Sequence, residues 1–248
     1  MQTLVRVISG LPSDLAASVC IVLHLAPGAP SALPAILQRR SRLPCRAAVD
    51  GEKLQTGEVL VAPPDRHLTI QDGRVSLTAG PRENGHRPSV DALFRSAALA
   101  QAGKVIGVVL SGTRDDGTLG LAVIKAAGGQ AIVQDPAEAL YPGMPASAIA
   151  GVAVDMVVPS DEVADAIVKA IAEPPAGSLV SADPPAAGDG PPFSGNPPFS
   201  GNPGHGHDPG PGRSGDPPEA YGDPDPLGGP GRATADLWRP PARSAAVC

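Results

Sequence analysis

Aromatic residues are scarce in this chain, at 2% of 248 residues, so a hydrophobic core has to be built mainly from Ala, Val, Leu and Ile. Basic residues are not in excess either. The net charge is −6, and no basic stripe is interleaved with aromatics, so nucleic acid is not an expected partner. No apolar run reaches the roughly 18–20 residues that a membrane helix needs. The N-terminus also lacks the basic-then-apolar order of a signal peptide. We therefore expect no membrane insertion and a reducing, cytoplasmic setting.

Cysteine is rare as well. Cys20, Cys45 and Cys248 are too few for a disulfide framework and show no metal-ligand spacing. The first two lie in apolar runs and are expected to be buried small hydrophobes, with a reactive thiol as the alternative. The segment "GHGHD" (204–208) could hold a metal weakly, but solvated imidazoles are the simpler expectation in a Gly/Pro-rich stretch. No metal and no organic cofactor is predicted.

Composition changes sharply after Glu173. Residues 174–248 contain 18 of the 31 prolines and 14 of the 30 glycines, including the tandem repeat "PPFSGNPPFSGN" (191–202). Such a segment cannot bury enough apolar surface to offset its ordering entropy. We predict a folded domain over residues 1–173 and a disordered Pro/Gly-rich tail over 174–248.

Strand and helix patterns alternate within residues 1–173. The runs "VCIVLH" (19–24) and "KVIGVVL" (104–110) are continuously apolar, as expected of strands covered on both faces. Strands separated by helices predict an α/β fold with a doubly wound, mostly parallel sheet. A β-rich insert over 45–79 interrupts the alternation, and its Gln-Asp-Gly turn predicts an edge β-hairpin.

Two polar groups follow predicted strands: His24, and the turn "SGTRDDG" (111–117). Ligands bind at the carboxyl ends of strands in open α/β sheets. An acid of that turn could orient the imidazole, as in a nucleophile–His–Asp arrangement. Two simpler interpretations remain, a polar edge histidine and an acid that caps the following helix. A phosphate-binding module is a third, which the lack of a Lys-Ser/Thr pair disfavours.

Particular motifs of the sequence resemble the catalytic domain of the CheB family, the chemotaxis protein-glutamate methylesterases, in order over about residues 1–172. "RPSVDALF" and "GMP" are the most particular of them. The segments that carry the resemblance are "HLAPG" (24–28), "DGEKLQTGEVLVAPPDRHLTI" (50–70), "HRPSVDALFRSAA" (86–98), 107–149 and a closing "VD.VVP".

The resemblance implies hydrolysis of γ-glutamyl methyl esters on methyl-accepting chemotaxis receptors, and often deamidation of certain receptor glutamines. These receptors are the implied protein partners, with other chemotaxis signalling proteins as further candidates. The family normally carries a phosphoacceptor receiver domain ahead of the catalytic domain, as part of phosphorelay signalling. The 248 residues leave no room for one, so we expect a stand-alone catalytic domain.

The resemblance also assigns roles to site residues. His24 would be the catalytic base and Asp116 the carboxylate that orients it. Thr113 stands where the family has Met, and its backbone N–H would help to form the oxyanion hole. Arg114 replaces a glycine and must adopt the backbone angles of that turn. Met144 is a candidate substrate contact in the same cleft, or else a packing methionine.

The family's nucleophilic serine lies in a G-x-S-x-G-G turn between the first strand and the first helix. Here the first predicted helix begins at Met1, so the sequence contains neither that strand nor that turn ahead of it. Ser9 lies at the far end of the helix, and Ser13, Ser18 and Ser111 lie on other elements. We expect the chain as given to be inactive or nearly so. One explanation is a misplaced start codon with the serine upstream; the other is a truncated, catalytically dead relative that acts as a binding module.

Overall fold

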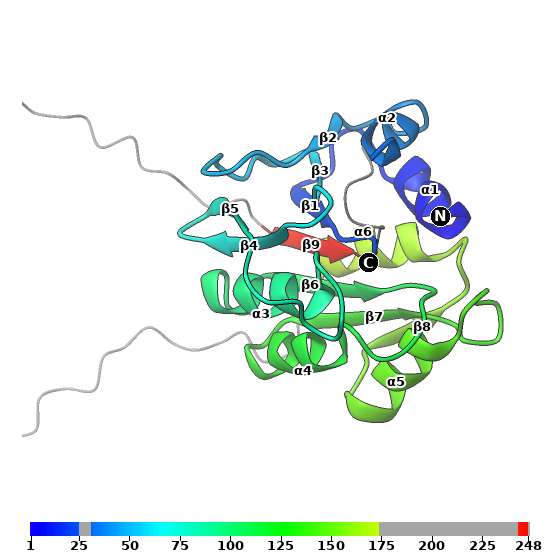
Figure 1. Cartoon of the computed structure of the whole chain (residues 1–248). Helices are drawn as coiled ribbons and strands as arrows, with labels where there is room; N and C mark the ends of the chain where they lie inside the picture. The colour runs from blue at the N-terminus through cyan, green and yellow to red at the C-terminus, as the bar shows by residue number, and fades with distance from the viewer. Residues whose placement is uncertain (25–30, 174–242, 248) are drawn as a thin grey trace, which may run out of the picture. The chain divides into compact units, whose positions relative to one another are not determined.

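The computed structural model describes residues 1–24, 31–173 and 243–247. All of them belong to one compact unit (Figure 1). The tandem repeat and the "GHGHD" segment lie outside these residues. The elements are α1 Gln2–Gly10, β1 Ala17–Ile21, α2 Leu33–Gln38, β2 Cys45–Ala47, β3 Val59–Val61, β4 His67–Gln71, β5 Arg74–Thr78, α3 Val90–Ala100, β6 Val105–Val109, α4 Thr118–Ala126, β7 Gln130–Gln134, α5 Gly143–Gly151, β8 Met156–Val158, α6 Val163–Ala172 and β9 Arg243–Val247.

Seven strands form one sheet in the order β2-β3-β1-β9-β6-β7-β8, and every neighbouring pair is parallel (Figure 1). The hairpin β4–β5 is antiparallel and makes a second, two-stranded sheet of its own. The predicted α/β fold with a parallel sheet and a hairpin is therefore confirmed. The β-rich insert contributes to both sheets: its first two strands, β2 and β3, join the main sheet, and its last two form the hairpin.

Side chains that alternate along the strands enter two separate cores. In β1, Val19 and Ile21 pack with residues of α1, α2 and α6, whereas Cys20 packs with residues of α3 and α4 and of the hairpin. This alternation follows from the period of two along a strand. Helices thus cover both faces of the sheet, which is the doubly wound arrangement and explains the continuously apolar strands.

The C-terminal strand β9 was not expected. Residues 243–247 fall in the segment predicted to be disordered, yet they pair in parallel with β1 on one side and β6 on the other (Figure 1). Ala245 and Val247 enter one core and Ala246 the other. The short "RSAAV" run was not recognised as a strand because the segment around it is rich in proline. Two facing strand edges supply the hydrogen-bond partners that such a run cannot supply for itself.

Polar side chains fix the register of β9. The Ser244 hydroxyl lies 2.9 Å from that of Ser18 and donates to Gln101 Oε1 at 2.7 Å. The Arg243 guanidinium donates to Gln130 Oε1 at 3.1 Å and to a backbone carbonyl at the end of α6. A slip by one residue would move these polar groups to the wrong face of the sheet. The strand is therefore held by specific contacts as well as by its ladder.

Candidate active site

His24 and Asp116 come together at the carboxyl edge of the sheet. His24 follows β1, and Asp116 lies in the turn between β6 and α4; these two strands flank β9. The Nε2 atom of His24 lies 2.7 Å from Oδ2 of Asp116. The imidazole is partly exposed, whereas the carboxylate is fully buried. Parallel strands separated by one neighbour thus bring together two residues that are 92 positions apart in the chain.

The Asp116 carboxylate is enclosed by donors. Its Oδ1 accepts from the Ser89 hydroxyl at 2.8 Å, from Asn84 Nδ2 at 3.1 Å and from the Asp91 backbone N–H at 3.1 Å. Its Oδ2 accepts from the Val90 N–H at 2.9 Å, beside the His24 ring. Burial alone would raise the pKa of this carboxyl, but these hydrogen bonds, led by that of His24, hold the pKa well below its usual range. Asp116 is therefore ionised at neutral pH.

The two backbone donors belong to the first turn of α3, so Asp116 caps a helix that it does not precede. The first N–H groups of a helix have no partner within the helix. Asp91 does the same in return, accepting from the N–H groups of Gly117 at 3.1 Å and Gly120 at 2.7 Å at the start of α4. The interpretation of Asp116 as a cap of α4 is thus wrong. Sequence reasoning missed Asp91, although it stands in the "RPSVD" motif.

Asp91 is buried like Asp116, but its carboxyl pKa is shifted in the opposite direction. Burial raises the pKa of the Asp91 carboxyl, opposed by the Gly120 N–H and the Asn84 amide, and the nearby Asp116 charge raises it further. The Asn84 amide joins the two acids, since it donates to Asp91 Oδ2 at 2.8 Å as well as to Asp116. Asp116, Asp91 and Asn84 thus form one hydrogen-bonded group, which holds the His24 ring through Asp116.

An ionised carboxylate only accepts hydrogen bonds. The Nε2 of His24 must therefore carry the proton that it shares with Asp116, which leaves the lone pair on Nδ1. Nδ1 is consequently the nitrogen of His24 that can accept a proton from a substrate or nucleophile.

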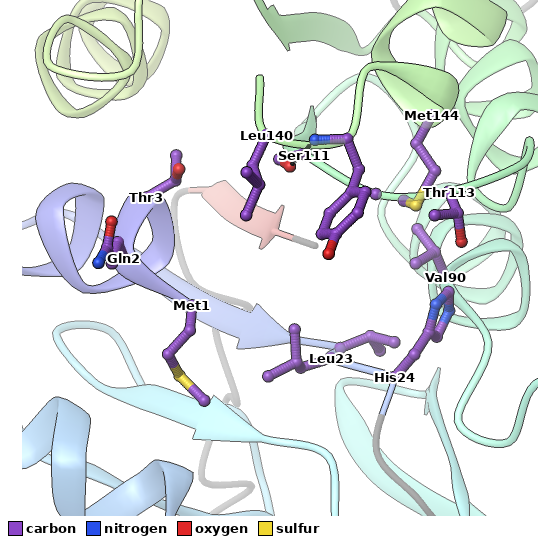
Figure 2. Close-up of a pocket in the computed structure, with 13 residues that line it drawn as sticks. Met1, Gln2, Thr3, Leu23, His24, Val90, Ser111, Thr113, Leu140 and Met144 are labelled. Carbon is purple, nitrogen blue, oxygen red and sulfur yellow. Dashed lines mark hydrogen bonds between the residues drawn. The ribbon is translucent and has the colours of Figure 1, made fainter. Parts of the chain in front are cut away.

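A cavity of about 730 Å³ lies beside the His24 ring (Figure 2). His24, Thr113 and Met144 all contribute to its wall, whereas Asp116, the fourth predicted site residue, does not line it and is joined to it through His24. The start of α1 lines the same pocket. The full lining is Met1, Gln2, Thr3, Val22, Leu23, His24, Val90, Ser111, Gly112, Thr113, Leu140, Tyr141 and Met144.

The turn after β6 and the start of α5 are bound to each other. The Gly112 N–H donates to the Tyr141 carbonyl and the Met144 N–H donates to the Gly112 carbonyl, each at 2.9 Å. A Cβ on Gly112 would lie 2.1 Å from the Met144 sulfur, so a larger residue there would displace the Met144 side chain. Met144 is buried and also lines the pocket, which fits both of the expected roles. Arg114 has a φ of +69°, the left-handed conformation that its replacement of glycine led us to consider.

Several serine hydroxyls of the described residues are hydrogen-bonded to groups other than His24. Ser9 donates to the Arg6 carbonyl, Ser18 bonds Ser244, and Ser89 donates to Asp116. Ser111 lines the pocket but accepts the Tyr141 N–H at 2.9 Å. Among these residues, no serine hydroxyl is hydrogen-bonded to His24.

Cys20 and Cys45 are buried and unpaired, and burial raises the pKa of the Cys20 thiol to about 12. Both thus lie in the core as expected, and burial raises the pKa of the Cys45 thiol as well. Within residues 1–24, 31–173 and 243–247, no cluster of three or more His, Cys, Asp or Glu side chains could hold a metal ion. The helices of this part of the chain are also too short or too polar to cross a bilayer.

Comparison with known proteins bears on this site. The chain is 41% identical over 166 residues to a protein-glutamate methylesterase/protein-glutamine glutaminase 2 of Anaeromyxobacter dehalogenans. The aligned region covers 67% of this chain and 49% of that protein. It is 36% identical over 178 residues to a protein of the same name from Methanosarcina mazei, covering 68% and 48%. The chain thus spans about half the length of these curated relatives.

The described fold is similar to the crystal structure of the Thermotoga maritima CheB methylesterase catalytic domain, with a TM-score of 0.65 and 32% identity. The match covers 68% of this chain and 91% of that one. The CheB methylesterase family model matches residues 1–167, which contain both His24 and Asp116. The chain therefore belongs to the CheB methylesterase family.

Proposed function

We propose that this chain provides the histidine and the carboxylate of a protein-glutamate methylesterase that hydrolyses glutamyl methyl esters on chemotaxis receptors. The observation that carries the proposal is the 2.7 Å bond from His24 Nε2, in the wall of a pocket, to the buried, ionised Asp116 behind it. The names of the relatives support the substrate class, and glutamine deamidation is the second activity that these names include. A cytoplasmic location and a place in chemotaxis signalling belong to the same proposal.

In the proposed reaction a serine hydroxyl attacks the ester carbonyl while Nδ1 of His24 takes its proton. Asp116 stabilises the imidazolium that forms and keeps the ring oriented. The Thr113 backbone N–H would donate to the tetrahedral oxyanion. The imidazolium then protonates the departing methoxide, and methanol leaves. Water, activated by the same nitrogen, attacks the acyl-serine and releases the glutamate carboxylate and the free serine.

We further propose that the nucleophile is not among the 248 residues. The start of α1 lines the same pocket as His24 (Figure 2), so a turn leading into this helix would present a serine to that pocket. There the N–H groups of the helix's first turn would also face the reacting carbonyl. None of the described serines lies at that position. The chain by itself should then be inactive, and a form with the strand and G-x-S-x-G-G turn ahead of Met1 should be active.

Methanol release from a methylated chemoreceptor tests the proposal. The 248-residue chain should release none above background, and the extended form should release it in multiple turnovers. His24→Ala in the extended form should reduce the rate by several orders of magnitude. The extended form adds a strand, and β9 already occupies the position between β1 and β6 that such a strand could take. The extended form is therefore also tested without residues 243–248. If neither extended form turns over, the esterase proposal fails.

A binding module is the second candidate, supported by the lack of a serine hydroxyl bonded to His24 among the described residues. A binding module would capture the receptor as the 248-residue chain, and neither this chain nor the extended form would release methanol. The DNA immediately upstream of the Met1 codon separates the two origins. An in-frame strand and G-x-S-x-G-G turn favours a misplaced start, and a nearby stop codon favours a dead relative.

A further inference from the structure

A second imidazole lies flat against His24. The rings of His24 and His86 are stacked, with 3.7 Å between their centroids and 4° between their planes. Among the described residues, no hydrogen bond joins His86 to Asp116, whose carboxylate is bonded to His24, Asn84, Ser89 and two backbone N–H groups. His86 therefore meets the pair through the face of the His24 ring.

A tight turn places this ring. Glu83 and His86 exchange two backbone hydrogen bonds, 3.1 and 2.8 Å long, around Asn84 and Gly85. Both central residues have positive φ, +52° and +81°, as a two-residue turn of this hand requires. The Asn-Gly pair therefore makes the turn, and the side chain of its first residue is the one that bonds both Asp116 and Asp91.

The other end of the turn is also tied down. Glu83 accepts from Arg95 of α3 at 2.6 Å. One short segment thus holds the carboxylate through Asn84, contacts α3 through Glu83, and covers the imidazole through His86. A ring carried by such an anchored segment can restrain the plane of the ring that it covers.

Packing alone does not account for a histidine at this position. The His86 Nε2 is buried and has no hydrogen-bond partner among the described residues. A buried polar atom without a partner costs free energy that an apolar ring would not. Burial, the facing His24 and the cations Arg114 and Arg82 lower the pKa of His86, against the opposing charge of Asp116. His86 therefore stacks as a neutral ring and does not compete for the carboxylate.

We propose that His86 is a positioning residue, whose ring fixes the plane of the His24 imidazole so that Nε2 stays on Asp116 and Nδ1 remains the basic nitrogen. This inference rests on the proposed function for its catalytic meaning. Its structural content, one fixed tautomer of His24, can be measured without any turnover.

The test is 15N NMR of the histidine side chains of the full 248-residue chain. Wild type and His86→Phe, which keeps a stacked ring, should show His24 as the Nε2–H tautomer with a slowly exchanging proton. His86→Ala should bring the two nitrogen resonances of His24 toward each other and speed exchange of that proton about tenfold or more. Arg46→Ala, on the edge strand β2, is the control, since it breaks the ion pairs of Arg46 with Glu52 and Glu58.

A fixed Nε2–H tautomer that persists in His86→Ala would overturn the proposal. So would its loss in His86→Phe or in Arg46→Ala, because neither removes the stacked ring and its loss there would point to general loosening. In an active extended form, His86→Ala should lower kcat by about 10- to 100-fold with little change in KM. If the extended form is inactive, the NMR result still decides the positioning role, so the two failures are distinguishable.

Discussion

Deleting residues 243–248 is expected to abolish cooperative folding of the domain. β9 is the fourth of seven strands, and its loss leaves the facing edges of β1 and β6 without ladder partners inside the molecule. It also removes the side chains of Ala245, Ala246 and Val247 from both cores. Domains of this size have a free energy of unfolding of only about 5–15 kcal/mol, so the loss of a central strand should cost more than the whole of it. Circular dichroism with chemical denaturation measures this.

A point substitution separates the strand from the length of the chain. Ala245→Asp puts a carboxylate in a fully buried position and should destabilise the domain by at least about 3 kcal/mol. The matched control is Val157→Asp on the edge strand β8. Val157 is 47% exposed, so this change should cost less than about 1 kcal/mol. A synthetic peptide of residues 241–248 should restore folding to the truncated chain. Unchanged stability after the deletion would show that β9 does not complete the sheet.

Asp116→Asn should have the largest effect on the site. The change keeps the shape but turns one acceptor oxygen into a donor, which then faces other donors, and it removes the charge at the start of α3. We expect a loss of about 3 kcal/mol or more in the free energy of unfolding. In an active extended form the rate should fall about 10⁴-fold, because an imidazole without its carboxylate takes the wrong tautomer.

The stability loss should depend on pH. The folded-state pKa of Asp116 lies below its unfolded value, so its stabilisation is complete above about pH 4 and is lost as the pH falls below that value toward the folded pKa. The difference between wild type and Asp116→Asn should therefore be largest near neutral pH and shrink on acidification. Denaturation curves at pH 7 and pH 3 check this. A difference that stays constant, or grows at pH 3, would contradict the assignment of an ionised, bonded Asp116. Asp155→Asn, at an exposed Lys125 pair, is the control.

The layered fold could be predicted because it depends on local patterns. Continuous apolar runs such as "KVIGVVL" and helix patterns between them determine a parallel sheet covered on both faces. β9 could not be predicted in this way, because a five-residue run of Arg, Ser, Ala and Val has no period that distinguishes it within a Pro-rich segment. Its conformation is decided by the two strand edges that receive it, which only the tertiary structure contains.

The site shows the same division. His24 and Asp116 were identified by their place after strands and by family motifs, and the structure brings them within hydrogen-bond distance. Their catalytic roles, and those of Thr113 and Met144, stay predictions. Asp91, Asn84 and His86 were missed, because capping across two helices and ring stacking join residues from different elements. The Asn-Gly turn before the "RPSVD" motif was the one local signal that could have directed attention to them.

The most direct test of the central claim is labelling by a serine-directed fluorophosphonate, with the modified residue identified by mass spectrometry. The claim is that His24 and Asp116 serve a serine that enters at the start of α1 and is not one of these 248 residues. The 248-residue chain should remain unlabelled, whereas the extended form should be labelled at the serine of its G-x-S-x-G-G turn and lose that label in His24→Ala. Labelling of any serine within residues 1–248 that depends on His24 would contradict the claim.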